Sequence, residues 1–162
     1  KVSNAGNYYL SFNDDLIILG FNYNTGAIMG LGQDILISDR FILGGNNFRG
    51  FKQSGIGPRD PVTNSSLGGN IFYTGSVKAS FGIGLPPELG VKGNWFTTFG
   101  SLTGIDKNTE VYKDDASIRL STGVGISWNS PFGPISIILS EAILKEKYDI
   151  TEAVSFGIGT KF

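Results

Sequence analysis

The chain has 162 residues, with 13 Lys and Arg against 14 Asp and Glu, and its formal net charge is −1 at pH 7. The basic residues are scattered singly, which argues against a nucleic-acid interface because such an interface needs a basic face. The sequence contains no His and no Cys. Because these residues supply the commonest general base, the thiolate nucleophile and the usual metal ligands, we expect no enzyme, no metal site and no cofactor.

The apolar residues follow the spacing of strands rather than that of helices. No apolar run approaches the roughly 18 residues of a membrane-spanning helix. Apolar and polar residues instead alternate over segments of about 10 to 13 residues, long enough for a tilted strand to cross a bilayer. This pattern predicts an all-β chain of antiparallel transmembrane β-barrel strands.

About seven such strands are predicted along the chain. They cover residues 7–13, 16–29, 70–81, 91–102, 116–128, 135–144 and 152–162. The alternation over 116–128 is the clearest, with Ile118, Leu120, Val124 and Ile126 on one side and Arg119, Ser121 and Ser127 on the other. We expect the first set to face lipid and the second to face the lumen of a barrel.

The predicted connections alternate between short turns and longer loops. The turns lie near residues 13, 85 and 131, and the loops cover about 33–69, 103–115 and 145–151. This asymmetry is typical of the periplasmic turns and extracellular loops of outer-membrane barrels. Because a structureless connection longer than about 15 residues usually has a function, we place the function in the loop at about 33–69.

The long loop contains the motif Phe48-Arg49-Gly50-Phe51, flanked by Arg40-Phe-Ile-Leu-Gly-Gly-Asn and Gly55-Ile-Gly-Pro-Arg-Asp. With Leu67-Gly-Gly-Asn70 and the later stretch Gly125-Ile-Ser-Trp128-Asn-Ser-Pro131-Phe-Gly-Pro134, it resembles the bacterial outer-membrane barrel-assembly insertases, which belong to the barrel assembly and translocation superfamily. The resemblance covers essentially the whole chain, and its motifs are jointly specific.

The resemblance implies that residues 1–162 are the C-terminal portion of an outer-membrane β-barrel domain, about seven strands of an expected total of about sixteen. The chain begins with Lys1 rather than Met, which also favours a piece of a longer protein. Seven strands cannot close a barrel, and open edges are not viable in lipid. We therefore expect the missing strands, or a second copy of the chain, to cover the edges.

The function implied by the resemblance is non-enzymatic insertion and folding of β-barrel precursors into the Gram-negative outer membrane, through a lateral seam at the last strand. The implied partners are outer-membrane lipid, unfolded β-barrel clients and periplasmic assembly lipoproteins. Two alternatives stay open: a polypeptide-exporting or passive transport barrel of the same superfamily, and a soluble ligand-binding barrel.

In this family the loop folds into the lumen, where its arginine contacts acidic residues of the wall. The matching wall positions here are Lys78 and Thr98, which cannot accept a salt bridge. We therefore expect Arg49 to anchor the loop through Asp60 or backbone carbonyls, because a desolvated guanidinium needs acceptors. The alternative is that Arg49 is a solvated loop residue.

The end of the chain, Ser155-Phe-Gly157-Ile-Gly159-Thr-Lys-Phe162, resembles the C-terminal β-signal of barrel precursors, although Thr160 departs from the usual pattern. Gly157 and Gly159 weaken strand pairing, which in the family lets the last strand separate from the first. The alternative is that these glycines only relieve barrel curvature. Together with Phe162, they are the residues predicted to form the seam.

Overall fold

The computed structural model describes residues 1–13, 16–106, 112–131 and 133–158. Within them the chain forms one sheet of seven strands, β1 (Val2–Phe12), β2 (Ile17–Ala27), β3 (Ile71–Gly82), β4 (Val91–Thr103), β5 (Arg119–Ser130), β6 (Gly133–Leu144) and β7 (Val154–Ile158). Single 3₁₀ turns lie at η1 (Ile37–Asp39) and η2 (Pro87–Leu89). In this part of the chain, no helix is both long enough and apolar enough to span a membrane.

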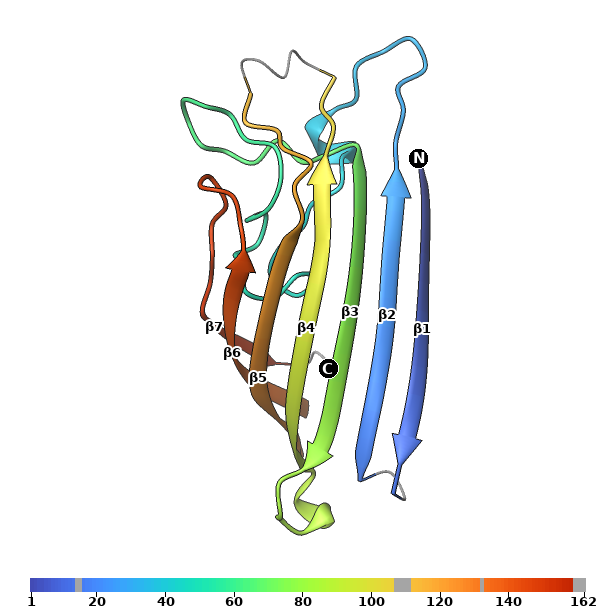
Figure 1. The fold of residues 1–162 in the computed structure, drawn as a ribbon, viewed down its shortest axis with the longest axis vertical. Helices are drawn as coiled ribbons and strands as arrows, with labels where there is room; N and C mark the ends of the chain where they lie inside the picture. Colours follow the sequence, from blue (N-terminus) through green and yellow to red (C-terminus); the bar gives the residue numbers. More distant parts are fainter. Residues whose placement is uncertain (14–15, 107–111, 132, 159–162) are drawn as a thin grey trace.

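The strands follow one another in chain order, each pairing antiparallel with the next (Figure 1). The predicted all-β fold with about seven antiparallel strands is therefore confirmed. Short turns join the strands at one end of the sheet, and the long connections lie at the other end (Figure 1). The longest connection covers residues 28–70, between β2 and β3.

The observed strand ends differ from the predicted ones by a few residues, and β5 covers 119–130 rather than 116–128. β1 begins at Val2 rather than at residue 7, because its Asn-rich and Gly-rich start pairs in register with the end of β2, as in Val2 opposite Ala27. β7 begins at Val154 rather than at residue 152, because Thr151 and Glu152 pair with the long connection instead. Predicted strand residues 159–162, including Gly159 and Phe162, lie outside the described residues.

Alternation along the strands gives the sheet two different faces. On β5, Val124 and Ile126 are 53% and 52% exposed, whereas Arg119 and Ser121 are fully buried. The predicted alternation of two faces is therefore observed along β5, although Ile118 lies before the strand, and the placement of these faces against lipid and lumen stays a prediction. Large apolar side chains stay exposed on one face along the other strands too, including Phe21, Phe99, Ile137 and Phe156.

The hydrophobic core lies between the opposite face and the long connection. Its buried members from the connection are Leu43, Phe48, Phe51 and Ile56, and its members from the sheet are Phe72 on β3 and Leu102 on β4. Each such side chain contributes about 1.5–3 kcal/mol when it is removed from water. The connection therefore acts as the second layer of the fold.

Candidate functional site

The loop motif forms a tight turn at the inner end of the long connection. The Gly45 N–H donates to the Phe51 carbonyl at 2.8 Å, and the Asn47 side chain bonds the Gly44 N–H and the Ile42 carbonyl at 2.8 and 2.9 Å. This turn directs the side chains of Phe48 and Phe51 into the core. We call residues 43–56 the loop tip.

Both aromatic residues of the motif are completely buried. Phe48 and Phe51 pack edge to face, with ring centroids 5.3 Å apart and an interplanar angle of 87°. This geometry is the favourable one for an aromatic pair. The two rings therefore hold the loop tip against the inner face of the sheet by apolar packing rather than by an ion pair.

Gly50 lies where no side chain fits. Its φ is +92°, and an added Cβ would lie 2.8 Å from the Ser121 Cβ on β5. The Gly50 carbonyl accepts the Glu152 N–H at 3.0 Å. The absence of a side chain thus lets the loop backbone approach both β5 and the segment that leads into β7.

Arg49 lies inside the molecule, only 9% exposed, and its guanidinium carbon is 5.7 Å from the centroid of the Phe96 ring on β4. This is a cation–π distance. Burial lowers the pKa of Arg49, but a guanidinium stays protonated at neutral pH. The predicted wall positions Lys78 and Thr98 line a groove of about 490 Å³ beside the loop tip, together with Asn46 and Asn47.

Asp60, the expected anchoring partner, lies further along the connection. Its Oδ1 accepts the backbone N–H groups of Val62 and Thr63 at 2.9 and 2.8 Å. This is the pattern of an Asx turn, in which an aspartate stabilises its own turn. These contacts stabilise the turn at Asp60, and its role as an anchor of Arg49 stays a prediction.

The loop tip also pairs with the segment that precedes β7. Lys52 N–H donates to the Ile150 carbonyl at 2.9 Å, and Ile150 N–H donates to the Gly55 carbonyl at 3.0 Å. With the bond from Glu152 to Gly50, these contacts make a short antiparallel ladder. The sequence predicted only a polar loop over residues 145–151, so this pairing was missed.

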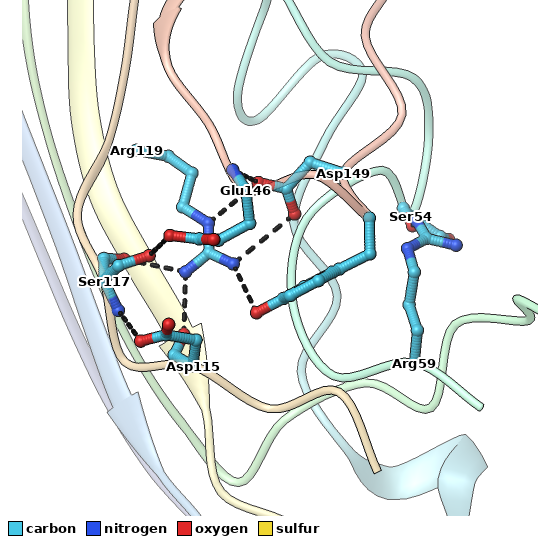
Figure 2. A network of polar contacts seen from close by, with 8 residues as sticks. Ser54, Arg59, Asp115, Ser117, Arg119, Glu146 and Asp149 are labelled. Carbon is cyan, nitrogen blue, oxygen red and sulfur yellow. Dashed lines mark hydrogen bonds and ion pairs between the residues drawn. The ribbon is translucent and has the colours of Figure 1, made fainter. Parts of the chain in front are cut away.

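Arg119 fastens the same segment to the start of β5 (Figure 2). Its Nε and Nη2 donate to the two Asp149 carboxylate oxygens at 3.0 and 3.4 Å, and Nη2 also donates to the Tyr148 hydroxyl at 3.1 Å. Its Nη1 donates to the carbonyls of Asp115 and Ser117 at 2.8 and 2.7 Å. All five N–H donors of the guanidinium therefore have acceptors, as a fully buried arginine requires.

A second ion pair holds the other end of the long connection, residues 35–42 and 66–70, which we call the loop base. Arg40 Nη2 lies 3.2 Å from Asp106 Oδ2, and Asn70 donates to the other carboxylate oxygen at 2.9 Å. Arg40 also donates to the carbonyls of Ile35 and Leu67. The loop base is thereby tied to the connection between β4 and β5.

Arg59 makes a third buried link. Its guanidinium donates to the carbonyls of Asn64 and Ser54, and its backbone exchanges two hydrogen bonds with Lys113. Burial lowers the pKa of Arg59, partly opposed by Asp149 and Tyr148. The connection is therefore held to the β4–β5 connection at this point as well.

The structure thus brings Phe48, Arg49, Gly50 and Phe51 together at the loop tip. Gly157 lies apart on β7, opposite Ser136 of β6, and Gly159 and Phe162 are outside the described residues. Sequence reasoning missed the ion pairs of Arg119 and Arg40. A single arginine on a face of Ser and Gly was a signal for Arg119, but its acidic partner is 30 residues away.

Known proteins resemble this chain along nearly all its length. It is 39% identical to the outer membrane protein assembly factor BamA of Neorickettsia risticii over 95% of the chain and 21% of that protein. It is 28% identical to the 50 kDa subunit of the sorting assembly machinery of Saccharomyces cerevisiae, over 93% of the chain and 33% of that protein. The chain thus spans about a fifth to a third of these relatives.

The fold matches a solved structure at low sequence identity. The crystal structure of BamA from Haemophilus ducreyi lacking POTRA domains 1–3 superposes with a TM-score of 0.82 and 18% identity, covering 95% of this chain and 33% of that one. The Omp85 superfamily domain matches residues 1–162. With the seven-stranded meander and its inward-folded loop, these matches establish that the chain belongs to the Omp85 superfamily.

Proposed function

We propose that this chain is the C-terminal portion of the β-barrel of an outer-membrane assembly factor, which inserts and folds β-barrel precursors without making or breaking a covalent bond. The observation that carries the proposal is the loop tip, docked on the inner face of the sheet and paired with the segment that enters β7. The 39% identity to a BamA protein supports the same function.

The exposed apolar face supports a place in the outer membrane of a Gram-negative bacterium. β1 to β6 are 11 to 13 residues long, which suffices for a tilted strand to cross the hydrocarbon core. Spin labels at residues 126 and 127 test this placement. A lipid-soluble quencher should reach position 126 and a water-soluble one position 127; equal access at both would contradict it.

The docked loop favours an assembly factor over a passive pore. Buried aromatic side chains and a backbone ladder hold residues 43–56 against the inner wall, where a porin keeps an aqueous channel. An exporter of the same superfamily would share this loop, so it stays the second candidate. Clients that are folded into the membrane, rather than released across it, would favour the assembly factor.

The seam is proposed to lie at β7. Among the described residues β7 pairs with β6 alone, at the end of the strand order, and Gly157 contributes no side chain to packing. An edge strand leaves backbone groups that an incoming strand can satisfy by β-augmentation. The driving force would be burial of client apolar surface and completion of its hydrogen bonds in lipid. Unfolded barrel proteins, outer-membrane lipid and periplasmic lipoproteins are the proposed partners.

The test uses the full-length protein in lipid vesicles, supplied with an unfolded β-barrel client. We expect client folding to be faster than in empty vesicles. A disulfide engineered between residue 158 and the first strand of the complete barrel should stop this folding and leave the barrel intact, and reduction should restore it. Undiminished insertion with the crosslink formed would rule out the seam; no acceleration by the wild type would rule out the function.

A further inference from the structure

The connection between β6 and β7, residues 145–153, is held at two adjacent places. Asp149 binds Arg119 at the start of β5, with both side chains fully buried. The next residue, Ile150, exchanges hydrogen bonds with Lys52 and Gly55 of the loop tip. The ion pair and the ladder are therefore directly consecutive along the chain.

Asp149 also shapes its own turn. Its Oδ2 accepts the Glu146 N–H at 2.8 Å, and its own N–H donates to the Glu146 carbonyl at 3.1 Å. Glu146 in turn accepts the Ser117 hydroxyl at 2.7 Å, beside the carbonyls that bind Arg119 (Figure 2). A network with this many satisfied contacts has one geometry, so the position of Asp149 determines where Ile150 presents its backbone.

We propose that Arg119 and Asp149 are positioning residues that align residues 150–152 with the loop tip. In this arrangement, the docking of residues 50–55 and the position at which β7 begins, at Val154, depend on each other. Loss of the pair would release the ladder, because an uncompensated buried charge can regain water only if the turn moves outward. The consequence for clients, a change in how readily β7 opens, rests on the proposed function.

The loop base provides a matched control inside the same molecule. Arg40 and Asp106 also form an arginine–aspartate ion pair, with the aspartate partly exposed, but their contacts are to Ile35, Leu67 and Asn70. At the loop base, Phe41 and Gly69 exchange backbone hydrogen bonds at 2.9 and 3.0 Å. Hydrogen exchange at the amides of Phe41 and Gly69 therefore reports on the Arg40–Asp106 pair. Exchange at the amides of Lys52, Ile150 and Glu152 reports on the Arg119–Asp149 pair.

The experiment measures amide hydrogen exchange in the full-length protein in lipid bilayers, for Asp149→Asn, Arg119→Lys and Asp106→Asn. Asp149→Asn should accelerate exchange at Lys52, Ile150 and Glu152 by at least about tenfold, with much smaller changes at Phe41 and Gly69. Asp106→Asn should show the reverse pattern. Arg119→Lys, which keeps the charge but loses the bidentate geometry, should fall between wild type and Asp149→Asn.

A general loss of stability would raise exchange at both sets of amides in every variant, and this result would overturn the proposal. Unchanged exchange at Lys52, Ile150 and Glu152 in Asp149→Asn would also overturn it. If Asp149→Asn does not fold, the same comparison between Arg119→Lys and Asp106→Asn decides.

Client folding by the same variants then tests the link to β7. We expect Asp149→Asn to change the folding rate by several-fold or more, in step with exchange at Glu152. A released ladder with an unchanged client-folding rate would overturn the link while the wild-type rate still supports the proposed function. If the wild-type protein did not accelerate client folding, the proposed function would be overturned. The exchange data would still decide whether Arg119 and Asp149 are positioning residues.

Discussion

The two ends of the long connection are attached to the sheet by different physics. The loop tip is held by buried aromatic rings, a glycine that approaches β5 closely and a backbone ladder. The loop base is held by the backbone hydrogen bonds between Phe41 and Gly69, by contact of the Phe41 and Phe72 rings, and by an ion pair whose aspartate side chain is 26% exposed. Because solvent and salt weaken exposed charges but not buried contacts, the tip should be the firmer attachment. This difference indicates that the loop motif attaches the connection firmly to the sheet, whereas the attachment at the loop base is released more easily.

The comparison is tested most strongly by removing an aromatic ring from the tip. Phe51→Ala should destabilise docking of the tip by about 3–5 kcal/mol, because the ring is fully buried and leaves a cavity. Proteolysis within residues 28–70 should rise sharply. Phe99→Ala, on the exposed face of β4, is the control and should leave that cleavage unchanged; equal cleavage in both variants would contradict anchoring by the buried ring.

The close approach of Gly50 to Ser121 is the next test. Gly50→Ala should cost about 2–4 kcal/mol, from the positive φ together with the contact at β5. Gly32→Ala separates the two causes, because Gly32 has a φ of +84° but nothing within 4 Å of an added Cβ. Hydrogen exchange at the Glu152 amide should therefore become faster in Gly50→Ala and stay unchanged in Gly32→Ala. Similar increases in both variants would show that backbone strain by itself explains why position 50 is a glycine.

Removing the motif arginine should have a smaller effect. Arg49→Ala should loosen the tip by about 1–2 kcal/mol, since a desolvated cation–π contact has about this value. Arg49→Lys should restore part of the loss and of client folding, because the charge remains but the planar group does not. Lys52→Ala, which removes an exposed charge from the same loop, is the control. Wild-type cleavage in Arg49→Ala would make Arg49 a bystander.

Asp60 should give the smallest effect. Asp60→Ala should cost about 0.5–1 kcal/mol by removing the Asx turn. A double-mutant cycle with Arg49→Ala measures whether the two residues interact, as the sequence led us to expect. A coupling energy above about 0.5 kcal/mol would support anchoring, and additivity would assign Asp60 to its local turn only.

The order, type and two-sided character of the strands were determined by the sequence alone. The reason is that alternation with a period of two is a local property, so residues such as Val124 and Ser121 report their faces without any knowledge of their neighbours. The loop motif was also recognisable, because Arg49 and Gly50 lie next to each other in the chain. Strand ends were less certain where Asn and Gly weaken the alternation, as at the start of β1.

The attachments of the loop were decided only by the tertiary structure. The partner of Arg119 is 30 residues away, and the ladder between Lys52 and Ile150 joins two stretches without strand-like sequence. Such contacts depend on how two separate connections meet above one face of the sheet, and neither connection carries a spacing that specifies the other. Buried hydrogen-bond donors need acceptors, and which acceptors are within reach depends on the folded molecule rather than on the local sequence.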